Sequence, residues 1–264
     1  MMTSPAGRLP RPAPSIAPST ASSIEPKVAP EVITRLRTTS TATIATLLFK
    51  HGIRNGFVQG VTRLGGQKPR MVGPAFTLRY IAAREDTDQL SVFTDPQHPQ
   101  RQAIEQCPDG HVLVMDCRQD SSAASAGSLL LRRLQVRGAA GAVTDGGIRD
   151  FDEVASLDMP VYSAGPCALT NLTKHHAVDL NVAISCGTCP VYPGDIVVAD
   201  GDGVMVIPRG LAAQIAQEAG AMELYETFVR EQINAGAPII GLYPATDPDN
   251  LEKFEAWKAT RKDP

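Results

Sequence analysis

Residues 141–153 read Gly-Ala-Val-Thr-Asp-Gly-Gly-Ile-Arg-Asp-Phe-Asp-Glu, and this stretch carries the strongest indication of both fold and chemistry. Its first residues are small, apolar or β-branched and predict a buried strand. The strand leads through a double glycine to the adjacent pair Arg149 and Asp150. A guanidinium beside a hard carboxylate suits an oxyacid bound to a metal ion. A turn with both side chains facing water is the alternative that the spacing leaves open.

The residues before this stretch predict one helix and one strand. Gly127 and Ser128 precede an apolar helix expected over residues 129–136, which Gly138 ends. An apolar strand is expected over residues 139–144. The chain therefore passes from helix to strand immediately before the Arg-Asp pair.

The start of that helix offers a second half of a binding site. A helix that begins with glycine presents unpaired N–H groups, so the backbone from Gly127 through Ser128 and Leu129 to Leu130 could receive a substrate carboxylate. Ser128 as an ordinary helix cap is the simpler alternative. Because Arg149 lies one helix and one strand further along, both features are at the ends of consecutive elements and could share a crevice.

Apolar residues elsewhere in the chain recur at both helical and strand spacing. Ser40 and Thr41 can cap a helix that is expected to end near Gly52. Residues 86–105 are polar and are expected to hold one short helix and exposed loops, without a chemical role. Further helices are expected over about 211–234 and 251–262, and strands over 71–82, 111–117, 160–163, 178–185, 196–198 and 204–207. This succession predicts a mixed α/β fold with at least two layers.

Composition divides the chain into three parts. Residues 1–30 are rich in Pro, Ser and Ala and lack an apolar period, which predicts a disordered arm. Residues 31–241 are expected to form the α/β domain. Residues 242–264 form a tail whose short helix contains the sole tryptophan, Trp257. This tail could pack on a neighbouring subunit or on its own domain.

The overall composition excludes several classes of protein. The 264 residues, 43% hydrophobic and 20% charged, fit one ordinary globular domain. A net charge of −3 and the absence of a long basic run argue against a nucleic-acid partner. No segment is apolar for the roughly 18 residues that a membrane span requires, and no secretory signal is found, so a cytoplasmic protein without a membrane partner is expected. The five cysteines, an odd number, are expected to be reduced thiols.

Two weaker patterns are given structural roles. Cys186 and Cys189 have the spacing of redox and zinc sites, but no second cysteine pair exists and a redox motif would open a helix. We expect these cysteines to pack near a strand end rather than to join residues 175–176, two histidines, in a metal site. Asp200 and Asp202 lack the remaining spacing of a calcium loop and are expected to form a turn.

Four segments together resemble the RraA-like family, which includes the 4-hydroxy-4-methyl-2-oxoglutarate aldolases. The likeness extends from about Val32 to about Gly241. The matching segments are Gly73-Pro-Ala-Phe-Thr-Leu-Arg79, Ala126-Gly-Ser-Leu-Leu130, Arg137-Gly-Ala-Ala-Gly-Ala-Val-Thr-Asp-Gly-Gly-Ile-Arg-Asp150 and Pro193-Gly-Asp-Ile-Val-Val-Ala-Asp-Gly-Asp-Gly-Val204. The resemblance implies an α/β fold of the swivelling β/β/α layered type, a homotrimer or hexamer, and a site between subunits.

The resemblance also implies roles for individual residues. Asp150 would be the protein's direct ligand to Mg²⁺ or Mn²⁺, and Arg149 would contact the pyruvyl oxygens of the substrate. The amides of residues 127–130 would receive the substrate carboxylate. Glu153 corresponds to an acidic position that ends the family's Arg-Asp motif, and it would support the residues that bind metal and substrate without binding either directly. Ser128 stands where many catalytic members carry an Asp, and a neutral hydroxyl is a poor general base.

These implications lead to three hypotheses about function. The first is a metal-dependent lyase of the class II aldolase type, which cleaves small 2-oxo acids by retro-aldol chemistry, releases pyruvate and could decarboxylate oxaloacetate. Both reactions leave an enolate, whose charge a divalent cation and Arg149 would stabilise. A lysine Schiff base is the other common solution, but only Lys174, in a run that looks exposed, occurs between Lys68 and Lys253.

The other two hypotheses keep the same fold. One is a non-catalytic regulator that binds a ribonuclease or another protein, which the family name implies and which Ser128 favours because the family acid is missing. The other is a related metal-dependent enzyme that cleaves a sugar-derived 2-oxo acid or a β-diketo acid, with a water placed by a residue other than Ser128.

Overall fold

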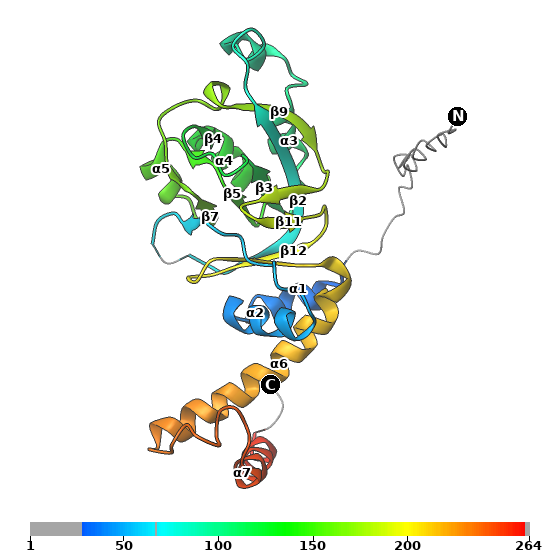
Figure 1. Cartoon of the computed structure of the whole chain (residues 1–264), viewed down its shortest axis with the longest axis vertical. Helices are drawn as coiled ribbons and strands as arrows, with labels where there is room; N and C mark the ends of the chain where they lie inside the picture. Colours follow the sequence, from blue (N-terminus) through cyan, green and yellow to red (C-terminus); the bar gives the residue numbers. More distant parts are fainter. Residues whose placement is uncertain (1–27, 67, 262–264) are drawn as a thin grey trace, which may run out of the picture.

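The chain folds into layers of helices and sheet, as the sequence predicts (Figure 1). The structure is a computed structural model that describes residues 28–66 and 68–261. The arm predicted over residues 1–30 lies outside the described residues up to residue 27, and the first helix, α1, begins at Pro30. A proline at the first helical position loses no hydrogen bond, because that N–H would be unpaired in any case.

One eight-stranded sheet forms the centre of the molecule. Strands β2, β3, β5 and β7 run parallel, and β1, β9, β12 and β13 pair antiparallel around them. The order is β1-β7-β5-β3-β2-β12-β13, with β9 beside the last part of β2. The strands span Thr62–Arg63 (β1), Met71–Ala82 (β2), Val112–Asp116 (β3), Gly141–Thr144 (β5), Val161–Ser163 (β7), His175–Leu180 (β9), Ile196–Ala199 (β12) and Val204–Ile207 (β13).

The longest strand, β2, holds together two parts of this sheet. Its first residues, Met71–Pro74, pair with β12, whereas its last residues, Leu78–Ala82, pair with β9 on the same edge. Its other edge pairs with β3. Because β2 pairs with three strands, it joins them into one curved sheet.

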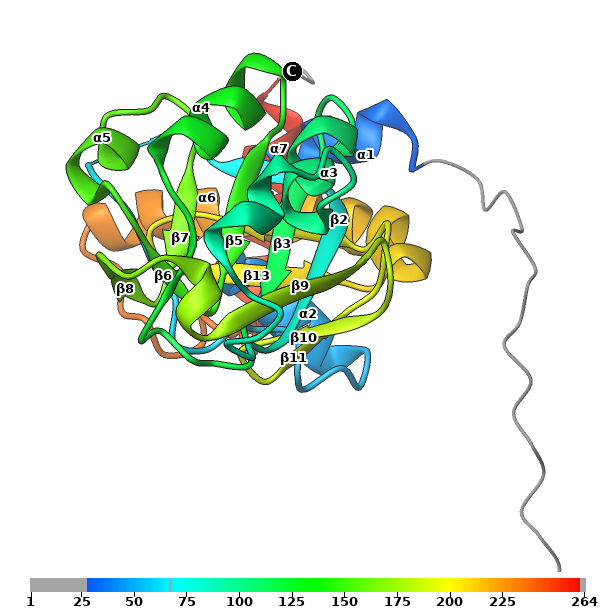
Figure 2. The ribbon, with the colours of Figure 1, turned by 90° about the horizontal axis from the view of Figure 1, so that it is seen from above.

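A three-stranded parallel sheet lies beside the main sheet (Figure 2). In its register Ala126 is opposite Ile148, and the Arg149 N–H donates a hydrogen bond of 3.0 Å to the Ala126 carbonyl. Gly127, which follows β4, therefore lies beside Arg149 and Asp150, which follow β6. The strands are β4 (Ala124–Ala126), β6 (Gly147–Ile148) and β8 (Gly165–Pro166), in that order.

Three helices cover one face of the parallel strands. Leu131 of α4 packs with Leu113 and Met115 of β3 in one hydrophobic core. Val112 and Val114 of the same strand belong to a second core on the opposite face. This alternation is typical of a strand that is buried on both sides. The helices are α3 (Pro99–Gln106), α4 (Ser128–Val136) and α5 (Phe151–Ala155).

The second core is closed by a hairpin of β10 (Ile184–Cys186) and β11 (Cys189–Val191). Cys186 and Cys189 are opposite each other in it as buried free thiols, so the expected packing near a strand end is what the structure shows. The single strand predicted over residues 178–185 is wrong. The chain turns at Asn181, whose left-handed φ of 53° ends β9 before β10 begins.

Helices α1 (Pro30–Leu36), α2 (Thr41–Lys50) and α6 (Ala212–Asn234) form a third layer against β12 and β13. The predicted cap of α2 is present, because the Ser40 hydroxyl accepts a hydrogen bond of 3.0 Å from the Thr43 N–H. Asp200 has a wider role than the predicted turn. Its carboxylate accepts hydrogen bonds from the Thr41 N–H at 2.9 Å and the Thr41 hydroxyl at 2.6 Å.

The far part of α6 extends away from the sheets and carries the last helix, α7 (Pro248–Ala259), on its end (Figure 1). Phe228 of α6 packs against Phe254 and Trp257 of α7, with ring centroids 5.5 and 5.6 Å apart. This contact lies within one chain. No helix in residues 28–66 and 68–261 is long and apolar enough to cross a membrane.

Candidate functional site

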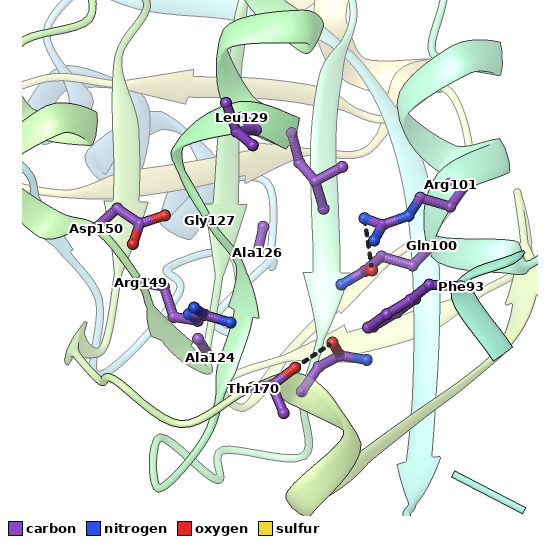
Figure 3. Close-up of a pocket in the computed structure, with 12 residues that line it drawn as sticks. Phe93, Gln100, Arg101, Ala124, Ala126, Gly127, Leu129, Arg149, Asp150 and Thr170 are labelled. Carbon is purple, nitrogen blue, oxygen red and sulfur yellow. Dashed lines mark hydrogen bonds between the residues drawn. The ribbon is translucent and has the colours of Figure 1, made fainter. Parts of the chain in front are cut away.

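A cavity of about 310 Å³ opens beside the three-stranded sheet (Figure 3). One wall consists of the start of α4, with Gly127, Leu129 and Leu130. Arg149 and Asp150, which follow β6, continue this wall. The structure thus brings to one cavity the two features that the sequence placed at the ends of consecutive elements.

Asp150 has a backbone conformation that few residues adopt. Its φ of 55° and ψ of 46° are left-handed, a region in which Asp and Asn are enriched among residues with a β-carbon. Although Asp150 immediately precedes α5, its side chain makes no capping hydrogen bond to that helix. The carboxylate turns instead towards the start of α4.

Ser128 holds one oxygen of this carboxylate. Its N–H and its hydroxyl each donate a hydrogen bond of 3.1 Å to Asp150 Oδ2. Ser128 is only 3% exposed and is not among the described residues that line the cavity. Ser128, a candidate catalytic and substrate-binding residue from the sequence, thus directs both its N–H and its hydroxyl to Asp150.

The start of α4 retains two amides for a ligand. The Ser128 N–H is used by Asp150, but the N–H groups of Leu129 and Leu130 have no acceptor in the described part of the chain. A β-carbon at Gly127 would lie 2.9 Å from Asp150 Oδ2, so this close approach requires glycine. Of the anion-binding backbone predicted over residues 127–130, the Ser128 amide is therefore already occupied by Asp150.

Arg149 and Glu153, two other residues singled out by sequence, are placed differently. Arg149 lines the cavity and has no carboxylate partner among the residues that the structure describes (Figure 3). Glu153 is exposed on α5 and does not belong to the described lining of the cavity. Arg149 can therefore reach a ligand in the cavity directly, and Glu153 does not contribute to its wall.

The opposite wall is formed by residues that the sequence reasoning missed. Phe93, Gln100 and Arg101 come from residues 86–105, the segment to which the sequence analysis gave no chemical role. The sequence analysis did not anticipate that this segment would line the cavity. The segment reaches the cavity because α3 packs beside α4 in the first core, a contact that no local pattern reveals.

A divalent cation would find one protein ligand at this cavity. No group of three or more His, Cys, Asp or Glu side chains within the described residues is placed to hold a metal ion. Asp150 is the one acidic residue in the described lining, and its Oδ1 has no hydrogen-bond partner there. The site fits Mg²⁺ or Mn²⁺, which take most ligands from water and substrate, and it does not fit a four-ligand zinc site.

Nucleophilic chemistry has little support in the described structure. Burial raises the pKa of the Cys107 and Cys189 thiols to about 12, so neither forms a thiolate at neutral pH. Lys174 is exposed, as expected, and lies outside the described lining of the cavity. A Schiff base at Lys174 would therefore form outside this cavity.

Comparison with known proteins adds an independent finding. A family model, RraA-like with the description Aldolase/RraA, matches residues 41–206. The chain is also 33% identical over 187 residues to a protein of Halalkalibacterium halodurans named "Putative 4-hydroxy-4-methyl-2-oxoglutarate aldolase". That alignment covers 71% of this chain and 81% of the relative.

Two solved structures have a similar fold. One is Streptomyces coelicolor RraAS2, described as an unusual member of the RNase ES inhibitor RraA protein family, with a TM-score of 0.67 and 31% identity over 78% of this chain and 98% of that one. The other is an uncharacterized protein from Pseudomonas syringae, with a TM-score of 0.71 and 25% identity over 83% of this chain and 100% of that one.

Proposed function

This chain belongs to the RraA-like family, and from that membership we propose that it is a metal-dependent carbon–carbon lyase that cleaves small 2-oxo acids and releases pyruvate. Oxaloacetate decarboxylation is a second reaction open to the same site. The relative named as an aldolase supports lyase activity. The observation that carries the proposal is the convergence of Asp150, Arg149 and the α4 amides on one cavity.

The residues of the cavity divide the binding of a 2-oxo acid between them. The N–H groups of Leu129 and Leu130 point from the positive end of α4 and would donate to the substrate carboxylate. Arg149 would donate charge-assisted hydrogen bonds to the oxygens of the pyruvyl part, where negative charge develops on bond cleavage. Both sets of donors are free of partners in the described structure.

Asp150 would hold the cation through Oδ1, because Ser128 already occupies Oδ2. When bound, Mg²⁺ or Mn²⁺ supplies Lewis-acid stabilisation of the negative charge that forms beside a 2-oxo group. Ser128 keeps the carboxylate facing the cavity and lacks the basicity for proton transfer. We expect a homo-oligomer, trimeric or hexameric, in which a neighbouring subunit adds the groups that complete the site.

Asp150→Asn tests this assignment without disturbing the backbone, because Asn also tolerates the left-handed conformation. We expect the variant to lose pyruvate release that depends on Mg²⁺ or Mn²⁺ while keeping the melting temperature of the wild type. Asp152→Asn is a matched control, since Asp152 is an exposed acid of α5 outside the described lining of the cavity. Unimpaired release by Asp150→Asn would remove Asp150 from the mechanism.

A second candidate function is a non-catalytic regulator that binds a ribonuclease or another protein. Ser128 in place of the family acid favours it, and the similar Streptomyces coelicolor protein belongs to a family described as RNase ES inhibitors. A panel of 2-oxo acids, including sugar-derived and β-diketo acids, separates the two functions. A lyase releases pyruvate from at least one of them with added metal, whereas a pure binding protein turns over none.

A further inference from the structure

A second cavity, larger than the one at Asp150, opens between α1 and one end of the central sheet. Its volume is about 860 Å³, and the two cavities have no described lining residue in common. Ile33 and Thr34 of α1 line one side, together with Arg37, which follows that helix. Residues 109–111, which precede β3, line the other side. The volume is within the range of cavities that hold drug-sized ligands, about 300–1,000 Å³.

Hydrogen bonds and core packing hold the walls of this cavity before any ligand arrives. The Gly110 N–H donates a hydrogen bond of 2.9 Å to the Gly138 carbonyl, and the Gly194 N–H donates one of 2.9 Å to the Ala75 carbonyl. Leu36 fixes α1, because it is fully buried in the core that includes residues of β12 and β13. Since the walls are already ordered, a ligand loses little binding energy to rearranging them.

Apolar groups make up much of the lining. Val28, Pro30, Ile33 and Pro74 face the cavity, and Val28 and Ile33 are only partly buried by the core against which they pack. An apolar ligand body would remove these side chains from water, which is favourable. The cavity therefore suits a ligand that carries a sizeable apolar part.

Positive charge is present at the same cavity. Arg37 and Arg209 line it from two different elements. Arg37 has no carboxylate partner in residues 28–66 and 68–261. Asp109 is the one acid in the described lining, and its Oδ1 packs against Gly138 at the end of α4. Arg37 can therefore donate charge-assisted hydrogen bonds to an anionic group of a ligand.

We infer that this cavity binds an organic anion with an apolar body, such as a medium-chain carboxylate, whose acid group meets Arg37. A neutral apolar molecule would leave the guanidinium without a partner, and a small inorganic anion would leave the apolar walls in contact with water. This binding site is separate from the cavity at Asp150, so it does not depend on whether the chain is a lyase.

Anilinonaphthalene sulfonate is a suitable probe, because it joins an apolar ring system to one sulfonate and fluoresces more strongly away from water. Fluorescence titration of the full chain should show a saturable site, from which decanoate displaces the probe about tenfold or more effectively than decanol does. Arg37→Gln should weaken binding of the probe by about tenfold. Thr34→Trp, which fills the cavity from an exposed position on α1, should abolish it.

Two control variants test where the probe binds. Arg35→Gln removes an exposed charge of α1 that is outside the described lining, and Ile240→Gln removes a side chain that is 88% exposed beyond α6. Both should bind the probe as the wild type does. If Ile240→Gln loses the probe instead, the probe lies on that surface and the inference is overturned.

Other outcomes also decide the question. The inference is overturned if the wild type has no saturable site, if Thr34→Trp or Arg37→Gln binds the probe as tightly as the wild type, or if decanol competes as well as decanoate. Circular dichroism shows whether Thr34→Trp is folded. If it is not, Arg37→Glu decides: we expect it to lose the probe because a carboxylate replaces the guanidinium, and wild-type affinity would overturn the inference.

Discussion

Replacing Ser128 by aspartate would place a second carboxylate against Asp150. In the structure the Ser128 hydroxyl donates a hydrogen bond of 3.1 Å to Asp150 Oδ2, within a buried position. Ser128→Asp removes this donor and introduces a negative charge in its place. We expect the variant to be less stable than the wild type without metal, and to recover its stability when a divalent cation binds between the two carboxylates.

The magnitude follows from the geometry. Two unit charges about 4 Å apart repel by about 4 kcal/mol at an effective dielectric constant of about 20. Asp150 is exposed, so water screens part of this repulsion, and protonation of one carboxyl relieves more of it. We expect a net loss of about 2 kcal/mol, which lowers the melting temperature by about 4–8 °C in a chain of this size. A cation at about 100 times its Kd returns about 2.7 kcal/mol.

Thermal denaturation with EDTA, and then with Mg²⁺ or Mn²⁺, measures both effects. Ser128→Asn is the matched control, because it has almost the same volume as Ser128→Asp and no charge. The reasoning is refuted if Ser128→Asn loses as much stability as Ser128→Asp, since bulk and not charge would then be the cause. It is equally refuted if metal fails to raise the melting temperature of Ser128→Asp more than that of the wild type. We also expect Ser128→Asp to release pyruvate faster, because a carboxylate can hold a catalytic water.

Two further predictions concern stability and reactivity. Burial opposes ionisation of Asp200, but hydrogen bonds from Thr41 outweigh it and leave its pKa below the ordinary value. The stabilisation is therefore present above the unfolded-state pKa and is lost as the pH falls through the lower folded-state pKa. Asp200→Asn should lower the free energy of unfolding, measured by urea titration, by about 1–3 kcal/mol at neutral pH and by progressively less in acid. Ellman's reagent should label one thiol rapidly, Cys167, because the other four cysteines are buried; rapid labelling of several thiols would contradict the packing.

Much of the fold could be predicted because its determinants are local. The strand over residues 71–82 has the bounds of β2, and the Ser40 cap and Gly138 stop are found where sequence places them. The apolar run before Gly147 belongs to the succession α4, β5 and β6, which ends just before Arg149 and Asp150. Connections between such short consecutive elements have few possible directions. Each of these sequence patterns spans a few residues, and the local structure that it predicts does not depend on a contact with a distant segment.

The rest of the site depends on contacts between distant segments. Phe93 and Arg101 lie in a polar segment, and they reach the cavity because α3 packs against α4 and β9. The role of Ser128 likewise depends on a hydrogen bond to a residue 22 positions away. A motif shows which residue types are present, but the partner that each side chain meets is decided by how the layers pack.

The pairing of β2 has a consequence for synthesis on the ribosome. Met71 pairs with Ala199, so roughly 130 residues must be added before this edge of the strand finds its partner. At about 5–20 residues added per second, this part of β2 remains without its β12 partner for about 6–26 s. During that interval the nascent chain exposes unpaired backbone groups together with apolar side chains that are buried in the folded protein. Holdase chaperones should therefore bind this segment more strongly then than at any later stage.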